Sequence, residues 1–292
     1  MKIAKNIVTV VLAILMALSV PLGIITFSVR SEIRNTSVLT AKIADEEYIS
    51  LVTARVQETV KRKLALVVIA PEQLADFFTA QALRDDAVTA LASSVNCAFG
   101  REYEKYSYKN DALRDEIERT LRAFSEENQI EFAEGSTDKV YTLLCDSISD
   151  ELRVVPEKYA QKAAKLSARA EKICSKWFVF PAVHIALAAA VIVIGRKKIT
   201  GALYNVLLPS YLGAFAAFAG SAIMLRKDYL ANTILKNEAF QYILHGMYRF
   251  VFEDMKQIAF ALTLTFAAAS LVVIVRIAVG GKRRHHSHSA KE

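Results

Sequence analysis

The sequence is poor in residues that interrupt helices, with 5 prolines and 10 glycines among its 292 residues. Between residues 30 and 176, only Pro71, Gly100, Gly135 and Pro156 belong to these two types. No alternation of apolar and polar residues long enough to indicate a β-strand occurs in this segment. The scarcity of breakers and the missing strand pattern exclude a sheet-rich domain and favour helices.

The sequence also lacks the short motifs that identify common enzyme sites. It has no phosphate-binding glycine loop, zinc-binding helix motif, nucleophile elbow, CxxC pair or glycine-rich dinucleotide turn. Without such a motif no side chain can be assigned to a reaction. We therefore expect a protein that is not an enzyme and that holds no cofactor.

Four long runs contain no Asp, Glu, Lys or Arg. They are residues 7–29, 177–195, 199–225 and 257–275. A hydrocarbon core of about 30 Å needs roughly 20 apolar residues in a helix, so each run is predicted to span a membrane. The first run is longer than the roughly 7–15 apolar residues of a secretory signal peptide, which predicts a retained signal anchor.

The basic residues next to these runs predict the topology. Residues 1–6, 196–198 and 276–292 hold ten Lys and Arg but a single acid, Glu292, whereas residues 30–176 hold 22 basic and 25 acidic residues. Short basic segments mark the cytoplasmic face of a membrane. We predict a multi-pass protein of the plasma or inner membrane with both termini in the cytoplasm. The net charge of +7 then gives little support to nucleic-acid binding.

The predicted fold is an all-α integral membrane protein with four transmembrane helices and a large helical extracytoplasmic domain between the first two. The predicted segments are 1–29 (N-terminus and first span), 30–176 (helical ectodomain), 177–195 and 199–225 (second and third spans), 226–256 (extracytoplasmic amphipathic helical connection), 257–275 (fourth span) and 276–292 (basic tail). The connection has a broad apolar and aromatic side, and we expect it to lie on the outer membrane surface or to dock on the ectodomain.

Apolar residues in the ectodomain recur at helical spacing. Tyr48, Val52, Val56, Val60 and Leu64 are spaced every four residues after an acidic first turn, and similar sets follow near residues 74–97, 113–124 and 140–152. Asn110 is a candidate cap for the third of these helices. Four to six helices are predicted in the ectodomain.

A heptad-like seam is predicted just before the second span. Tyr159, Ala163, Leu166, Ala170, Ile173 and Trp177 are spaced 4-3-4-3-4. We expect one continuous helix over residues 157–195 to lead from the ectodomain into the bilayer. Trp177 and Phe178 are predicted membrane-interface anchors, because aromatic residues are enriched at that depth.

All three cysteines, Cys97, Cys145 and Cys174, lie in the segment predicted to be outside, where disulfides persist. A disulfide between Cys97 and Cys145 would close a loop of about 48 residues and contribute on the order of 4 kcal/mol. The alternative is that both are small buried residues on helix faces, because free cysteine is often buried. The sequence leaves these two alternatives open.

Two polar residues, His184 and Asn205, lie inside predicted spans, where such residues are functional candidates. Counted from the ends of their runs, they lie about 10 Å apart along the membrane normal. We therefore expect each to make a separate hydrogen bond in helix packing.

Two groups of residues were considered as metal ligands. Asp146 and Asp150, with Glu151 beside them, are one helical turn apart, but they are more typical of a solvated face than of a calcium site. The histidines of the tail, His285, His286 and His288, are better explained as part of a basic tail near anionic lipid. No metal site is predicted.

These observations favour a non-catalytic, membrane-anchored envelope protein whose ectodomain binds a protein or another envelope component. The alternative is an extracytoplasmic small-molecule receptor or transport accessory that couples ectodomain binding to the four-helix membrane bundle. The segments predicted in the cytoplasm are too short for an output domain, and charged residues that would line a transport path are missing from the spans.

Overall fold

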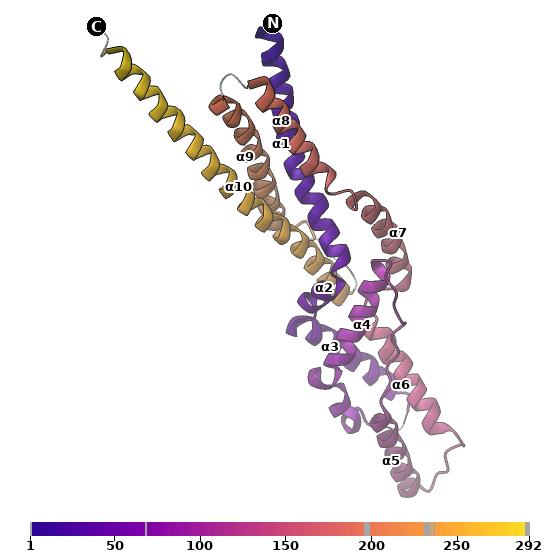
Figure 1. Cartoon of the computed structure of the whole chain (residues 1–292). Coiled ribbons are helices and arrows are strands. Elements are labelled where there is room, and N and C mark those ends of the chain that lie inside the picture. The colour runs from indigo at the N-terminus through magenta and orange to yellow at the C-terminus, as the bar shows by residue number, and fades with distance from the viewer. Residues whose placement is uncertain (1, 68, 196–198, 231–234, 236, 290–292) are drawn as a thin grey trace. The chain divides into compact units, whose positions relative to one another are not determined.

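The structure is a computed structural model, which describes residues 2–67, 69–195, 199–230, 235 and 237–289, and the side chains among them except those of residues 2–5 and 280–289. All the regular elements in this part of the chain are helices, and none of its residues forms a strand (Figure 1). The prediction of an all-α fold is confirmed.

The elements follow one another with few long connections. They are α1 (Lys2–Arg34), α2 (Thr36–Ile43), α3 (Glu46–Leu64), the 3₁₀ helix η1 (Pro71–Phe78), α4 (Ala80–Ala98), α5 (Asp111–Asn128), α6 (Ser136–Leu152), α7 (Glu157–Cys174), α8 (Val179–Gly195), α9 (Ile199–Lys227) and α10 (Glu238–Ser289).

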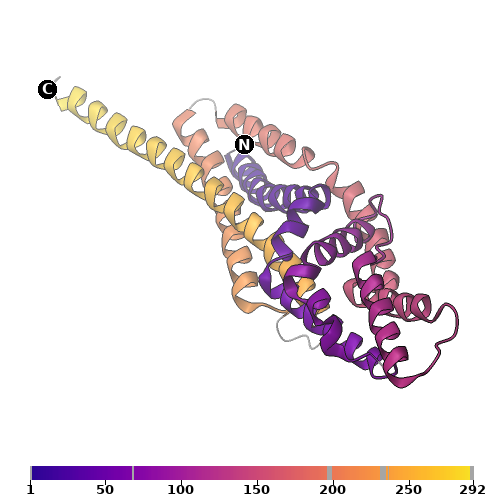
Figure 2. The ribbon, with the colours of Figure 1, turned by 90° about the horizontal axis from the view of Figure 1, so that it is seen from below.

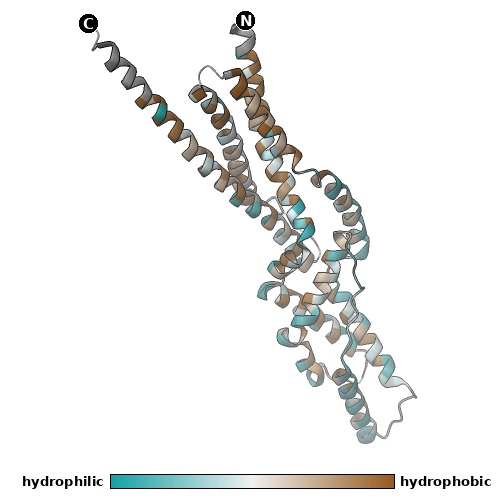
Figure 3. Ribbon diagram, in the orientation of Figure 1, coloured by the Kyte–Doolittle hydropathy of each residue, from teal (hydrophilic) through white to brown (hydrophobic). Residues whose placement is uncertain are grey.

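The chain divides into two compact units. Residues 1–32, 170–229 and 248–292 form one, here called the apolar unit, and residues 33–169 and 230–247 form the other, called the polar unit. Figure 3 shows the contrast in hydropathy between the largely apolar helices α1, α8, α9 and α10 and the more polar helices α3 to α6. Residues 230–247 thus pack with the predicted ectodomain, which was one of the two alternatives for the connection.

Four helices are long and apolar enough to cross a membrane, as the sequence predicts. The candidate spans lie in Asn6–Arg34, Ser136–Gly195, Ile199–Lys227 and Glu238–Val279. Large apolar side chains on these helices point outward, and Leu271 is 63% exposed. Burial of such faces in lipid removes a cost that they would have in water.

Small residues let the helices of the apolar unit approach closely. Helices α8 and α9 run side by side (Figure 1, Figure 2). In α9, a Cβ atom added at Gly213 would overlap the backbone carbonyl of Ala17 in α1. Ala217 and Ala259 are buried in the adjoining core. This arrangement is typical of membrane helices, which pack through small residues.

The polar unit is built around α3. Its predicted apolar stripe is buried, and each of its members is at most 3% exposed: Tyr48, Val52, Val56, Val60 and Leu64. Helix α3 packs against α4, α6 and η1. The carboxylate of Asp45 accepts a hydrogen bond from the backbone N–H of Tyr48 (3.0 Å) and begins α3, and the side chain of Asn110 begins α5 in the same way, as predicted.

The predicted continuous helix over residues 157–195 is wrong. Helix α7 ends at Cys174, residues 175–178 form a turn, and α8 begins at Val179. Pro181 explains the interruption, because its ring would clash with the carbonyl of residue 177 in a continuous helix and it has no N–H to donate. Starting the new helix at Val179 places Pro181 in the first turn, where proline is tolerated.

The unbroken helix is α10. It extends over 52 residues, from Glu238 to Ser289, and includes most of the predicted connection, the whole predicted fourth span and most of the tail. The sequence contains no proline and no glycine between Gly246 and Gly280, so it has no helix-breaking residue there. The connection and the fourth span, which we predicted as separate segments, are one element.

Gly213→Ala should destabilise the chain, because the added Cβ forces α9 away from the α1 backbone. Overpacking of this kind costs about 1–3 kcal/mol. Gly220→Ala is the matched control in the same helix, since a Cβ there meets nothing within 4 Å. Thermal unfolding of both variants in the same detergent tests the contact. Equal unfolding midpoints would contradict it.

Candidate functional site

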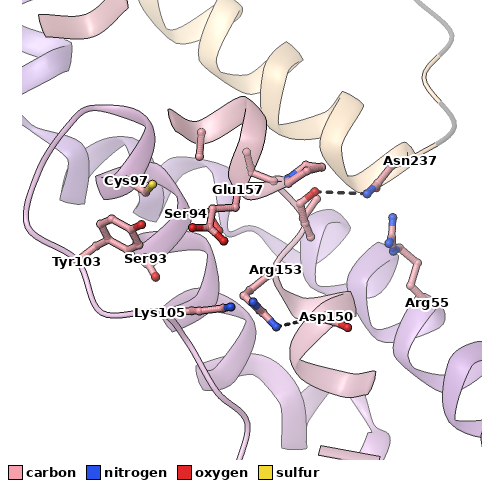
Figure 4. A pocket seen from close by; sticks show the side chains of 14 residues that line it. Arg55, Ser93, Ser94, Cys97, Tyr103, Lys105, Asp150, Arg153, Glu157 and Asn237 are labelled. Atoms are coloured by element: carbon pink, nitrogen blue, oxygen red, sulfur yellow. Dashed lines mark hydrogen bonds and ion pairs between the residues drawn. The ribbon is translucent and has the colours of Figure 1, made fainter. Parts of the chain in front are cut away.

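The polar unit contains a cavity of about 330 Å³ where several segments meet (Figure 4). Its volume falls within the range of small-molecule sites. The lining residues are Arg55 of α3, Ser93, Ser94 and Cys97 of α4, Tyr103 and Lys105 of the following segment, Asp150 of α6, Arg153, Val154, Val155 and Pro156 of the α6–α7 turn, Glu157 and Ala160 of α7, and Asn237.

The irregular segment 101–110 contributes two polar side chains to the cavity and is held by two tyrosines. The hydroxyl of Tyr106 donates to the Asp86 carboxylate (2.5 Å). The backbone N–H of Tyr108 donates to the hydroxyl of Ser149 in α6 (2.8 Å), and burial raises the pKa of Tyr108 to about 12. These anchors directly follow Tyr103 and Lys105, which line the cavity.

The turn between α6 and α7 forms another wall. Arg153 donates to the backbone carbonyl of Ser149 (3.1 Å) and pairs with Asp150 (2.6 Å). The carbonyl of Val154 accepts a hydrogen bond from the side-chain amide of Asn237 (3.4 Å). This hydrogen bond joins two cavity-lining residues that are 83 positions apart in sequence.

The cavity lining holds three cations, Arg55, Lys105 and Arg153, and two carboxylates, Asp150 and Glu157. Arg55 pairs with Glu151 (2.5 Å) and Arg153 with Asp150, whereas Lys105 has no ion pair with any described residue. In Figure 4 the side chains of Lys105 and Arg153 extend toward one another. Asp150 balances the charge of Arg153, so Lys105 is the cation of this lining with which an anionic group of a ligand could pair.

The cavity also holds the thiol of Cys97 and the hydroxyls of Ser93, Ser94 and Tyr103. Ser93 donates its hydroxyl proton to the carbonyl of Glu104 (2.5 Å). A hydrogen bond between Tyr103 and Cys97 raises the pKa of Tyr103. Hydroxyl, thiol and charged groups together offer several polar contacts to a ligand.

The three cysteines are free and buried in the structure. Cys97 lines the cavity, and Cys145 lies on the buried face of α6. Burial raises the pKa of the Cys145 thiol. This arrangement corresponds to the alternative in which Cys97 and Cys145 act as small buried residues.

His184 joins three helices of the apolar unit. Its Nδ1 lies 2.8 Å from the hydroxyl of Ser19 in α1, and its Nε2 lies 3.0 Å from the hydroxyl of Ser210 in α9. Asn205 is exposed on α9 and has no hydrogen bond with any described residue. Sequence reasoning missed Ser19 and Ser210, although a serine within an apolar run is a recognisable signal for such a partner.

The remaining predicted residues are placed as follows. Trp177 lies in the turn before α8, with its ring edge-on to Phe27 (5.3 Å between centroids) and the Arg30 guanidinium 5.7 Å from its centroid. Phe178 is 57% exposed. Asp146 is exposed.

The groups considered as metal ligands do not form a cluster among the described side chains. Asp150 and Glu151 are engaged in ion pairs with Arg153 and Arg55. Among the side chains that the structure describes, no three His, Cys, Asp or Glu lie close enough to hold a metal ion. His285, His286 and His288 lie outside those side chains.

Sequence reasoning did not find the cavity. Arg55, Lys105 and Arg153 are single charged residues on three separate segments, with no common motif or spacing. Only their contacts in the fold bring them together.

Comparisons with protein families, with curated proteins and with solved structures gave no match.

Proposed function

We propose that this chain is a non-catalytic, membrane-anchored receptor whose helical domain binds a small anionic molecule in the cavity. The observation that carries the proposal is the convergence of Lys105 and Arg153 within a cavity of about 330 Å³. Lys105 offers a charge without an acidic partner among the described residues. Ser94, Tyr103 and Asn237 supply further polar groups that can fix the orientation of a ligand.

The coupling of ligand binding to the membrane would run through α10. Asn237, which lines the cavity, is the residue before α10, and α10 continues into the fourth candidate span. Glu157, at the start of α7, lines the cavity as well, but the turn at residues 175–178 interrupts that route. A ligand that contacts Asn237 would therefore lie one residue from the start of the helix that contains the fourth candidate span.

The proposal includes a location and an orientation. The first apolar run would be a signal anchor in the plasma or inner membrane, the polar unit would lie outside, and both termini would be cytoplasmic. The support is the excess of Lys and Arg in residues 1–6, 196–198 and 276–292.

A scaffold that binds a protein or another envelope component through the polar unit is the second candidate. The segment between α5 and α6 favours it, because Ile130 is 49% exposed and Phe132 is 36% exposed there. Exposed apolar side chains of this kind are common at sites of protein contact.

Binding in the cavity can be measured on the full chain in lipid nanodiscs by thermal unfolding with inorganic phosphate and a panel of small carboxylates. We expect at least one anion to raise the unfolding midpoint. An anion at 100 times its dissociation constant stabilises the folded state by about 2.7 kcal/mol. The double variant Lys105→Gln, Arg153→Gln should lose this stabilisation.

Lys109→Gln is the matched control, because Lys109 lies on the same segment but does not line the cavity. This variant should respond to the anion like the natural chain. Equal stabilisation of the double variant would contradict the cavity as the site. If no anion stabilises the chain and crosslinking in native membranes recovers a stable protein partner, the second candidate replaces the first.

The orientation can be tested with single cysteines in a variant that lacks Cys97, Cys145 and Cys174. A membrane-impermeant maleimide added to intact cells should label a cysteine at position 109 and should not label one at position 289. Permeabilising the cells should expose position 289. Labelling of position 289 in intact cells would refute the orientation.

A further inference from the structure

Helix α7 and the turn after it carry three parallel stripes of different chemistry. The apolar stripe comprises Tyr159, Ala163, Leu166, Ala170, Ile173 and Trp177. One position before each of these lies a cation: Lys158, Lys162, Lys165, Arg169, Lys172 and Lys176. One position after the first five lie Ala160, Ala164, Ser167, Glu171 and Cys174. All three stripes keep the spacing that places residues on one face of a helix.

The third stripe faces the protein. Ala160 is 2% exposed, and the hydroxyl of Ser167 donates to the backbone carbonyl of Ala98 at the end of α4 (3.1 Å). Ala164 approaches Gly100 beside it. These contacts fix the rotation of α7 about its axis, so the other two stripes must point away from α4.

The apolar stripe is open to its surroundings. Leu166 is 64% exposed and Ile173 is 67% exposed. Tyr159 stacks on Phe240 (6.1 Å between ring centroids) but remains half exposed. The predicted seam is therefore open at Leu166 and Ile173, whereas its first and last residues, Tyr159 and Trp177, pack on aromatic rings.

The cationic stripe is exposed along its whole length. All six of its side chains are exposed, and none forms an ion pair with a described residue. Residues 157–176 hold six basic and two acidic residues, whereas residues 30–156 hold 16 basic and 23 acidic residues. Positive charge is thus concentrated on the one helix that leads into a candidate span.

Chain connectivity places this stripe close to a bilayer. Lys176 lies three residues before α8, which begins at Val179. From Lys158 to Lys172 the helix rise amounts to about 21 Å, and Lys176 follows in the turn. Electrostatic attraction to a charged surface falls off within about 10 Å in physiological salt. All six cations can be attracted only if the helix follows the surface along its length.

We propose that α7 binds the surface of an anionic phospholipid bilayer, with its apolar stripe at the boundary between headgroups and acyl chains and its cationic stripe on the lipid phosphates. An exposed apolar stripe bordered by Lys and Arg is the pattern of helices that bind at this depth. The charge of the stripe selects anionic lipid over a neutral surface. This inference is independent of the ligand proposed for the cavity.

The test uses the full chain, with its natural cysteines replaced, in nanodiscs of phosphatidylcholine with and without phosphatidylglycerol. An environment-sensitive fluorophore is attached to Leu166→Cys on the apolar stripe. The control carries it at Ala168→Cys, which is exposed on the same helix but belongs to none of the three stripes. With phosphatidylglycerol present, lipids brominated near the headgroup should quench the label at position 166 and leave that at position 168 unchanged.

Removing charge should release the helix. Each Lys or Arg near an anionic surface strengthens binding about fivefold. Replacing three of them, in the triple variant Lys162→Gln, Lys165→Gln, Arg169→Gln, should therefore lower the ratio of bilayer-bound to released α7 about 100-fold and abolish the quenching. These side chains are exposed, and circular dichroism should show unchanged helix content in the triple variant. Quenching that persists in that variant, or that is absent from anionic nanodiscs, would overturn the proposal.

A shielded label at position 166 in detergent, without any bilayer, would also overturn the proposal. That result would assign the apolar stripe to a second copy of the chain or to another protein.

Discussion

Four helices that are apolar enough to cross a membrane set the constraint on which the rest of this structure depends, because the inside of a bilayer holds no water. A backbone N–H or C=O in hydrocarbon must find its partner within the chain, and a helix satisfies both. Side chains cannot rely on the hydrophobic effect to bring such helices together, so packing depends on shape and on scarce polar contacts. Gly213 against Ala17, and His184 between Ser19 and Ser210, are contacts of these two kinds.

The same constraint separates the chain into two chemistries. Charged residues are absent from four long runs and dense in the segment between the first two, so one unit is suited to lipid and the other to water. Helix α10 belongs to both units, since residues 238–247 pack in the polar unit and the following residues in the apolar unit. Because α10 begins beside a residue of the cavity and contains the fourth candidate span, it is the element through which we propose that binding is coupled to the membrane.

The features that the sequence predicts well are those encoded by local periodicity. Four apolar runs of membrane length and the buried stripe from Tyr48 to Leu64 follow from spacing alone. The break before α8 is also encoded locally, in Pro181, but the heptad spacing up to Trp177 and the uninterrupted apolar run after it favour continuity. The cavity could not be predicted, because Arg55, Lys105 and Asn237 meet only through long-range packing.

The continuity of α10 is the most direct test of the link between the cavity and the membrane. Spin labels at the exposed positions Glu238 and Ala261, in a cysteine-free chain in nanodiscs, can be measured by pulsed electron paramagnetic resonance. At 1.5 Å per residue, an unbroken helix predicts one narrow distance distribution near 35 Å. A markedly shorter distance or a broad distribution would mean that the helix breaks between the units, and would contradict the proposed route.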